Sequence, residues 1–403
     1  MSVHWLSILG IGEDGVQGLS AAARGLLATA EVVFGAPRHL DLAGDLPSGT
    51  RRPWPSPMRD AVAAVLAERH RRVAVLASGD PFCFGIGSLL ADAVPVGEFI
   101  AIPAPSAFAW ACAALGWARQ DITTVSLCGR PPALLRPHLH SGARILALSA
   151  DAATPAAVGA LLRDHDCGRT RITALEALGG PRARIRRWTA DEAAPDDVDP
   201  LNLLALEIVT SPQARPVPYT PGVPESLFEH DGQITKRETR AMTLAQLAPR
   251  HGEHLWDIGC ASGSVAIEWL LRHPSLSATG IEARPDRAAR AARNAMALGV
   301  PRLDVRTGAA PAALDGLPAP DAVFVGGGIT TPRLLDTAWS ALRPGGRIVV
   351  NAVTWDSEAV LFDAWQRLGG EVTRQSVGRL DAIGGHHGFR PAMTVTQWTA
   401  TKS

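Results

Sequence analysis

The stretch LWDIGCASGS, Leu255–Ser264, decides the fold of the second half of the chain. Its apolar start predicts a buried strand, and its small residues fall where that strand ends and an apolar helix begins. Gly259 and Gly263 would let the backbone approach a ligand closely. Because open parallel sheets bind ligands at the carboxyl ends of their strands, the loop predicts a ligand crevice. Taken alone, the loop could equally be a tight turn.

Two carboxylates strengthen the prediction of a ligand site. Glu282 ends the next strand, about 20 positions after the glycine loop, where an acidic residue can accept hydrogen bonds from ribose hydroxyls. Asp257 stands before the first glycine, and the GxGxxG spacing of dinucleotide-binding loops is absent. A carboxylate there would repel a pyrophosphate, but it can receive the amino group of a methionine moiety.

Alternating strand and helix patterns on either side of this loop predict an α/β fold in both halves of the chain. In the second half they favour a doubly wound parallel sheet with an antiparallel edge strand at its end. In the first half they favour a parallel sheet followed by a second lobe. The expected strands are Trp5–Ile11, Arg72–Ala77, Phe99–Ile102, Asp121–Leu127, Ala143–Ser149, Arg171–Leu175, Leu201–Val209, His254–Gly259, Ala278–Ala283, Leu303–Arg306, Asp321–Val325, Arg347–Val353 and, at the edge, Met393–Ala400.

A proline-rich stretch separates the two halves. Proline disfavours both helix and central strand, so this stretch predicts an extended linker. We expect a first domain over residues 1–210, a linker over 211–224 and a second domain over 225–403. The prolines of the linker are Pro212, Pro216, Pro218, Pro221 and Pro224.

Composition excludes several classes of protein. A formal net charge of +0 lacks the basic excess of a nucleic-acid-binding protein. The apolar runs are far shorter than the roughly 20 residues that span a bilayer, and no basic leader precedes the first strand. The 5 cysteines form no CxxC pair and indicate neither disulfides nor a metal site. We expect a soluble cytoplasmic protein that binds no nucleic acid, membrane or metal.

From about Gly222 to Ala400 the chain resembles the class I S-adenosylmethionine (SAM)-dependent methyltransferases, and among them the precorrin decarboxylating methyltransferase domain of the cobalamin pathway. Besides the glycine loop, the resemblance rests on Thr235–Arg240, Gly308–Pro311, Asp321–Gly328 and Leu342–Val353. It implies a Rossmann-like class I methyltransferase fold that binds SAM. The SAM contacts expected from the loop and the resemblance are Thr235, Asp257, Gly259, Cys260, Ala261, Ser262, Gly263, Glu282, Ala309 and Ala310.

The second half also offers candidates for catalysis. Lys236 is either a ligand for a substrate carboxylate or a solvated charge in the first turn of an exposed helix. His386 and His387 lie in a glycine-rich stretch, predicted to be a loop that gates the site and moves protons or is simply solvated surface. Asn351, which lies in one of the family motifs, is the fourth catalytic candidate.

From about Val3 to Thr210 the chain resembles the tetrapyrrole methylase family. In that family SAM lies folded in a cleft between two lobes and is held largely by backbone groups. The implied SAM contacts are Gly79, Asp80, Ser106 and Ala107. The motifs that carry the resemblance are ILGIG at Ile8–Gly12, FGAPRHL at Phe34–Leu40, ASGDPF at Ala77–Phe82, PAPSA at Pro103–Ala107 and SLCGR at Ser126–Arg130.

Three arginines of the first half are candidates for substrate binding. Arg38, Arg119 and Arg130 could bind the carboxylates of an acidic macrocycle through bidentate pairs. Each of them alone could instead form a surface or interlobe ion pair.

Both halves depart from their family patterns in a loop. Ala261 and Ala309 stand where family members tend to carry glycine or an acidic residue, so we expect adenine to be recognised by the backbone. Glu13 and Asp14 stand where the usual glycine-proline-glycine follows the first strand, which gives this loop an unusual acidic character.

Together the two resemblances imply an enzyme of cobalamin biosynthesis that methylates a precorrin at two meso carbons and removes carbon dioxide from an acetate side chain. The SAM methyl group is already electrophilic, so such a site needs alignment and exclusion of water rather than a nucleophile. The same resemblance implies C5 methylation in the first domain, C15 methylation and decarboxylation in the second, and a homo-oligomer built on the second. The rivals are a SAM-dependent methyltransferase of RNA or another small molecule and a SAM-binding regulatory protein.

Overall fold

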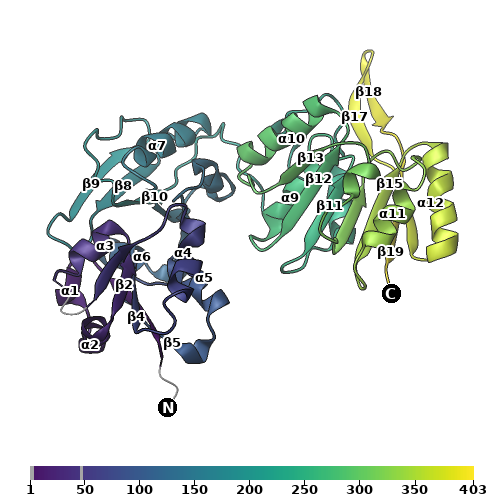
Figure 1. Cartoon of the computed structure of the whole chain (residues 1–403). Helices are drawn as coiled ribbons and strands as arrows, with labels where there is room; N and C mark the ends of the chain where they lie inside the picture. Colours follow the sequence, from purple (N-terminus) through teal and green to yellow (C-terminus); the bar gives the residue numbers. More distant parts are fainter. Residues whose placement is uncertain (1–3, 46–48) are drawn as a thin grey trace. The chain divides into compact units, whose positions relative to one another are not determined.

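The computed structural model describes residues 4–45 and 49–403 (Figure 1). Its contacts divide the chain into two compact units. One unit extends to Pro132 and resumes over His140–Ala214, and the other comprises Ala133–Leu139 and Arg215–Ser403. This division differs from the expected domain limits in the segment Ala133–Leu139, which clusters with the second unit. In the described ranges, no helix is long and apolar enough to cross a membrane.

The first lobe of the first unit is a parallel sheet covered on both faces. Its elements are β1 (Leu6–Ile11), α1 (Gly15–Gly18), α2 (Ala21–Thr29), β2 (Val32–Gly35), α3 (Pro37–Leu42), β3 (Thr50–Pro53), α4 (Ala61–Leu66), β4 (Val73–Ser78), α5 (Ile86–Ala93), β5 (Phe99–Ile102) and α6 (Ala107–Leu115). The strand order is β3-β2-β4-β1-β5, with parallel pairing throughout. Leu6 and Ile8 enter one core and Leu9 and Ile11 the other, because side chains alternate along a strand.

The second lobe of the same unit is a mixed sheet. It contains β6 (Thr123–Ser126), β7 (Arg144–Leu148), α7 (Thr154–Asp164), β8 (Arg171–Glu176), β9 (Arg184–Thr189) and β10 (Asn202–Glu207), in the strand order β6-β7-β10-β8-β9. The sequence pattern did not predict β9, because arginines dominate it. In the sheet, Arg184 and Arg186 bind the buried carboxylate of Glu176 on β8.

The second unit is a doubly wound sheet, as its sequence pattern predicted. Its strands are β11 (His254–Ile258), β12 (Ser277–Glu282), β13 (Asp304–Thr307), β14 (Ala322–Val325), β15 (Arg347–Ala352), β16 (Glu371–Gln375) and β19 (Val395–Thr401), and its helices are α8 (Arg237–Leu247), α9 (Ser264–Arg272), α10 (Pro285–Ala297), α11 (Leu334–Ala341) and α12 (Trp355–Leu368). The strand order is β13-β12-β11-β14-β15-β19-β16. One core packs under α8, α9 and α10 and the other under α11 and α12.

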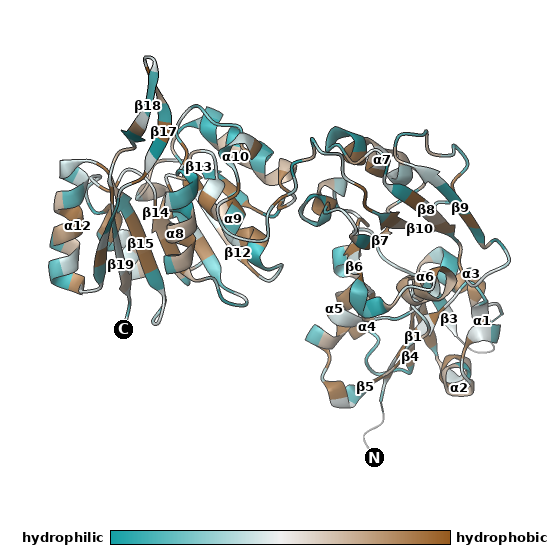
Figure 2. Cartoon of the chain, turned by 180° about the vertical axis from the view of Figure 1, so that it is seen from behind, coloured by the Kyte–Doolittle hydropathy of each residue, from teal (hydrophilic) through white to brown (hydrophobic). Residues whose placement is uncertain are grey.

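The α/β class predicted for both units is confirmed by these sheets. Figure 2 colours the central strands of both units mostly as hydrophobic, whereas much of α10 is coloured as hydrophilic. The residues that α10 buries are mainly alanines. One detail of the prediction is wrong: β19 is antiparallel, but it lies between β15 and β16 rather than at the edge. The strand at this edge of the sheet, β16, has the polar sequence EVTRQ and lacks the apolar pattern used to find strands.

The proline-rich stretch is packed on the second unit over part of its length. Residues 208–224, all of which the structure describes, form neither helix nor strand. Val217 and Val223 are nevertheless buried in the core of the second unit. The N–H groups of Gly222 and Val223 donate to the Glu268 carboxylate at 2.7 and 2.8 Å. This part of the linker is therefore fixed and is not a free tether.

Candidate active sites

The first unit contains a cavity of about 360 Å³ that is lined by both of its lobes. The loops that follow β1, β4 and β5 form one wall, and β7, β8 and β10 contribute the other. Gly79 has a φ of +55°, and a Cβ at this position would lie 2.7 Å from the Pro105 carbonyl oxygen. Glycine is therefore needed where the loop after β4 meets the loop before α6.

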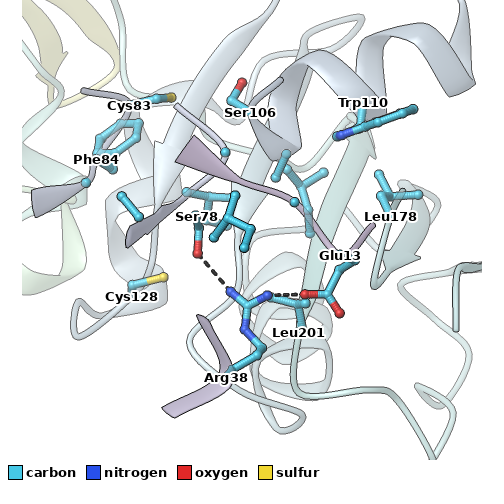
Figure 3. Close-up of a pocket in the computed structure, with 18 of the residues that line it drawn as sticks. Glu13, Arg38, Ser78, Cys83, Phe84, Ser106, Trp110, Cys128, Leu178 and Leu201 are labelled. Carbon is cyan, nitrogen blue, oxygen red and sulfur yellow. Dashed lines mark hydrogen bonds and ion pairs between the residues drawn. The ribbon is translucent and has the colours of Figure 1, made fainter. Parts of the chain in front are cut away.

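A cluster of polar side chains lies in this cavity around Arg38 (Figure 3). Arg38 pairs with Glu13 and donates a hydrogen bond to Ser78 Oγ at 2.8 Å. His39 Nε2 also lies 2.8 Å from Ser78 Oγ. Burial, together with the Arg38 charge, lowers the pKa of His39 to about 4, so its imidazole is neutral at physiological pH. Glu13 also accepts a hydrogen bond from Arg182 of the second lobe, and thereby ties the acidic loop across the cavity.

The structure brings together some of the residues predicted for this site and not others. Gly79, Ser106, Ala107 and Arg38 line the cavity. Asp80, Arg119 and Arg130 lie outside the lining that the described residues form. Asp80 accepts the Phe82 N–H within its own turn, the Arg119 guanidinium lies 5.3 Å from the Phe108 ring centroid, and Arg130 is exposed.

His39 and Ser78 line this cavity but were not predicted, although they lie in the motifs FGAPRHL and ASGDPF. Trp110 and Asn202 also line it and were missed. Their spacing along the chain carries no signal, because they come from α6 and β10 and meet only in the folded unit.

The second unit contains a cavity of about 630 Å³ along the carboxyl edge of its sheet. It extends from Glu282 at the end of β12 to Gln375 at the end of β16. Gly259 has a φ of +71°, and a Cβ there would lie 3.2 Å from the Gly327 backbone nitrogen. Glycine at position 259 thus lets two glycine-containing loops approach closely over the sheet. The predicted close approach of Gly259 to a ligand stays a prediction.

The two predicted carboxylates of the cavity have different surroundings. Glu282 accepts the N–H groups of Ala261 and Arg284, each at 2.9 Å, so each oxygen keeps acceptor capacity for a ligand hydroxyl. Asp257 Oδ2 accepts the Ala266 N–H at 3.0 Å, whereas the buried Oδ1 has no hydrogen-bond partner among the described residues. Burial, with the nearby Glu282 charge, raises the pKa of Asp257 to about 7.

Most of the predicted cofactor residues line this cavity, and two do not. Thr235, Asp257, Gly259, Cys260, Ala261, Glu282, Ala309 and Ala310 are part of its wall. Ser262 and Gly263 instead lie where the loop packs against α10. The Ser262 carbonyl accepts Asn294 Nδ2 at 2.9 Å, and a Cβ on Gly263 would lie 3.1 Å from the Ala291 Cβ of α10.

A buried ion pair that sequence reasoning missed positions the start of α8. Arg240 and Glu268 have fully buried side chains and are joined at 2.5 Å. Arg240 also donates to the carbonyl oxygens of Thr235 and Val223. The pair therefore holds Thr235 at the cavity wall and fixes the linker to α9. Arg240 belongs to the family motif Thr235–Arg240, but only the fold shows its partner.

Two of the four predicted catalytic residues line the cavity, and two do not. Lys236 lines the cavity, is half-exposed and lies 3.5 Å from Glu225. Asn351 lines it too and is held by Thr243 and Gln397 at 3.0 and 2.7 Å. The loop predicted at 384–388 is wrong beyond Gly385, because His386 and His387 begin a strand.

His386 and His387 lie outside the cavity lining formed by the described residues. They are exposed on β18 (His386–Pro391), which pairs with β17 (Gly378–Ile383) in a hairpin. Only the base of this hairpin reaches the cavity, through Val377, Arg379 and Ala392. The hairpin places the two histidines near its turn, whereas the predicted gating loop would have placed them at the site.

Each half of the chain matches a known protein family. Residues 6–194 match the tetrapyrrole (corrin/porphyrin) methylases, and residues 226–402 match the precorrin methyltransferase domain. A decarboxylating precorrin-6Y C(5,15)-methyltransferase from Sinorhizobium sp is 51% identical, over 99% of this chain and 96% of its own length. The chain belongs to this family, the decarboxylating precorrin-6Y C(5,15)-methyltransferases. As a member of the family it is a methyltransferase, and its reaction requires a methyl donor.

Relatives of the precorrin-6Y C(5,15)-methyltransferase family also match shorter parts of the chain. A decarboxylating cobalt-precorrin-6B C(15)-methyltransferase from Salmonella typhimurium is 32% identical, over 39% of this chain and 83% of its own length. The solved C-terminal domain of precorrin-6Y C5,15-methyltransferase from Rhodobacter capsulatus is 46% identical and covers 46% of this chain and 100% of that domain, with a TM-score of 0.44. Family membership favours precorrin methylation over the RNA and regulatory alternatives.

Proposed function

We propose that the chain methylates precorrin-6Y at C5 in its first unit and at C15 in its second, with SAM as the methyl donor at both sites. The second unit also removes the ring C acetate carboxyl group as carbon dioxide, which gives precorrin-8 in cobalamin biosynthesis. The observation that carries the proposal is that each unit of this methyltransferase has a cavity of its own. The match of residues 226–402 to the precorrin methyltransferase domain supports the C15 assignment.

The residues of the second cavity fit SAM. The buried Asp257 carboxylate leaves Oδ1 for the ammonium group of the methionine moiety, and Glu282 can accept the ribose hydroxyls. Ala309 and Ala310 offer backbone and small side chains to the adenine. Ala261 has a φ of +50°, a conformation typical of glycine, so the loop keeps its shape despite the substitution.

The residues of the first cavity fit SAM through backbone groups. Gly79 lies in one loop, Pro105 and Ser106 lie in another, and Ala107 begins α6. The two loops pack too closely for a side chain at position 79. Ser106 caps α6 by accepting the Ala109 N–H, so its hydroxyl is committed to the helix. The ordered loops therefore present backbone polar atoms to a ligand.

Bound SAM supplies an electrophilic methyl group, and the protein supplies alignment and exclusion of water. In the first unit, Arg38 is positioned by Glu13 and Ser78 and can hold a substrate carboxylate beside the neutral His39. In the second unit, Lys236 and Arg379 lie on the cavity wall for the same purpose. Glu225 and Glu238 partly neutralise these charges, which lowers the electrostatic free energy of the site when no substrate is bound.

Mass spectrometry and NMR of the product from precorrin-6Y and SAM test the proposal. The wild-type chain is expected to add two methyl groups and to release one carbon dioxide. Asp257→Asn should lower C15 methylation and carbon dioxide release by about tenfold or more, with C5 methylation retained, because one hydrogen bond to a charged group is lost.

Gly79→Val is the matched variant of the first unit, since a side chain there meets the Pro105 carbonyl oxygen. It should abolish C5 methylation and leave C15 methylation in place. Loss of C5 methylation in Asp257→Asn alone would contradict the assignment of the two sites.

A further inference from the structure

The side chain of Gln375 is buried, and its amide makes no hydrogen bond with the described residues. The residue is only 7% exposed and lines the second cavity. Neither its Nε2 nor its Oε1 has a hydrogen-bond partner within residues 4–45 and 49–403. Buried amides are almost always hydrogen-bonded, and an unpartnered one destabilises the folded chain. An amide retained here at such a cost indicates a ligand that completes its hydrogen bonds.

The neighbouring amides, in contrast, donate hydrogen bonds within the fold; of their atoms, Gln397 Oε1 has no partner among the described residues, but Gln397 lies outside the cavity lining. Gln397 Nε2 donates to Thr243 Oγ1 at 3.0 Å and to Asn351 Oδ1 at 2.7 Å. Asn351 Nδ2 donates to the same Thr243 hydroxyl at 3.0 Å. This network ties β15, β19 and α8 together beside the cavity. Gln375 takes no part in it and so keeps both of its N–H groups and its carbonyl oxygen for a ligand.

The sheet order places Gln375 on the substrate side of the cavity. β16 and β15 are both antiparallel to β19, so they run in the same direction and end at the same edge of the sheet. Gln375 is the last residue of β16, at one flank of the sheet. Glu282, the proposed ribose ligand, ends β12 toward the other flank. A ligand group bound at Gln375 therefore belongs to the substrate and not to SAM.

Two polar groups of the substrate side, Lys236 and Arg379, are cations. Lys236 lies 3.5 Å from Glu225, and Arg379 lies 2.6 Å from Glu238. Both cations are cavity residues that can bind the carboxylates of a tetrapyrrole. The cavity thus offers two kinds of carboxylate ligand, namely cations at the start of α8 and on β17, and a neutral amide at the end of β16.

Resting on the function proposed above, we infer that Gln375 binds the acetate carboxylate that leaves as carbon dioxide, and that Lys236 and Arg379 bind carboxylates that the product retains. In decarboxylation, the bond between the acetate methylene carbon and the carboxylate carbon breaks and its electron pair passes into the conjugated macrocycle. Carbon dioxide leaves, and the methylene carbon takes up one proton from water to become a methyl group.

A neutral amide suits the reacting carboxylate better than a cation does. The negative charge of this group disappears in the transition state, so a cation beside it stabilises the ground state more than the transition state. An amide N–H orients the carboxylate and shields it from water, but it stabilises the negative charge less than a cation does. The carboxylates that keep their charge bind Lys236 and Arg379 equally well in the ground state and the transition state. This binding therefore does not slow the reaction.

Two substitutions of Gln375 test the inference on the full-length chain, with precorrin-6Y labelled in the acetate carboxyl group. Gln375→Leu removes the amide at similar volume and should slow release of labelled carbon dioxide by about tenfold or more, with SAM affinity changed less than about twofold. Gln375→Lys should bind the substrate at least as tightly, with unchanged or lower KM, yet release carbon dioxide more slowly. Substrate binding that is as tight or tighter, combined with a lower kcat, is not expected from a merely structural role.

Two control variants accompany these substitutions. Lys236→Ala should raise KM with little change in kcat for carbon dioxide release. Gln366→Leu, an exposed glutamine on α12, should behave as wild type. If Gln375→Leu does not fold, the isosteric Gln375→Glu replaces it and should raise KM through repulsion between carboxylates.

Wild-type carbon dioxide release from Gln375→Leu, or faster release from Gln375→Lys, would overturn the inference. Failure of the proposed function has a separate signature, because wild-type chain would then release no labelled carbon dioxide from precorrin-6Y.

Discussion

Asp257 shows how a single buried residue can couple the stability of the folded chain to pH. Its pKa in the folded chain is about 7, against about 3.9 for an exposed aspartate. The folded state therefore binds more protons than the unfolded state between these values, and the stability present below pH 4 falls as pH rises through 7. Asp257→Asn should remove this dependence, which amounts to about 4 kcal/mol at most, so the variant gains stability at pH 8 relative to wild type.

Urea unfolding at pH 5 and pH 8 checks this expectation. Asp315→Asn, at an exposed position in the same unit, is the control and should follow wild type at both pH values. An Asp257→Asn chain whose stability falls between pH 5 and pH 8 as steeply as wild type would show that another group is responsible.

At the scale of elements, the Arg240–Glu268 pair links α8, α9 and the linker. Arg240→Ala leaves the buried Glu268 charge with only the Gly222 and Val223 N–H groups. Removing one partner of a buried pair typically costs about 3–5 kcal/mol, so we expect a loss of this size in the free energy of unfolding. SAM binding to the second unit should weaken as well, because Thr235 loses its anchor.

Chemical denaturation and calorimetry of the full-length chain measure both effects. Arg367→Ala is the matched control, since its ion pairs with Asp336 and Asp363 are exposed and should contribute about 1 kcal/mol or less. Equal destabilisation by the two substitutions would contradict the structural role of the buried pair.

At the scale of the whole molecule, the proposed homo-oligomer through the second unit has a candidate surface. Trp355, Phe362 and Trp365 are 89%, 41% and 45% exposed and lie on one face of α12. Exposed aromatic patches of this kind often mark protein contacts, and we expect a second copy of the chain to cover this one. Light scattering should give a mass above that of one chain, and Trp355→Asp with Trp365→Asp should reduce it. A monodisperse wild-type monomer would exclude the oligomer.

Much of the fold could be predicted because its signals are local. The strand, glycine loop and helix around Asp257 follow one another directly, and Glu282 ends the next strand, so spacing alone brought them together. Most of the apolar strands were found for the same reason, but the short buried strand β2 was missed. The polar strands β9 and β16 were not found, because arginines and edge positions remove the apolar pattern on which such a prediction depends.

By itself, the sequence determined the α/β class, the two families and the main loops that line the two cavities, since each is encoded in contiguous residues. The tertiary structure alone decided that Arg119 and Arg130 lie outside the first cavity, that His386 lies on a hairpin, and that Gln375 lines the second cavity. The physical reason is that these positions depend on strand order and on pairing between distant segments. Spacing along the chain does not encode which side chains meet across a sheet.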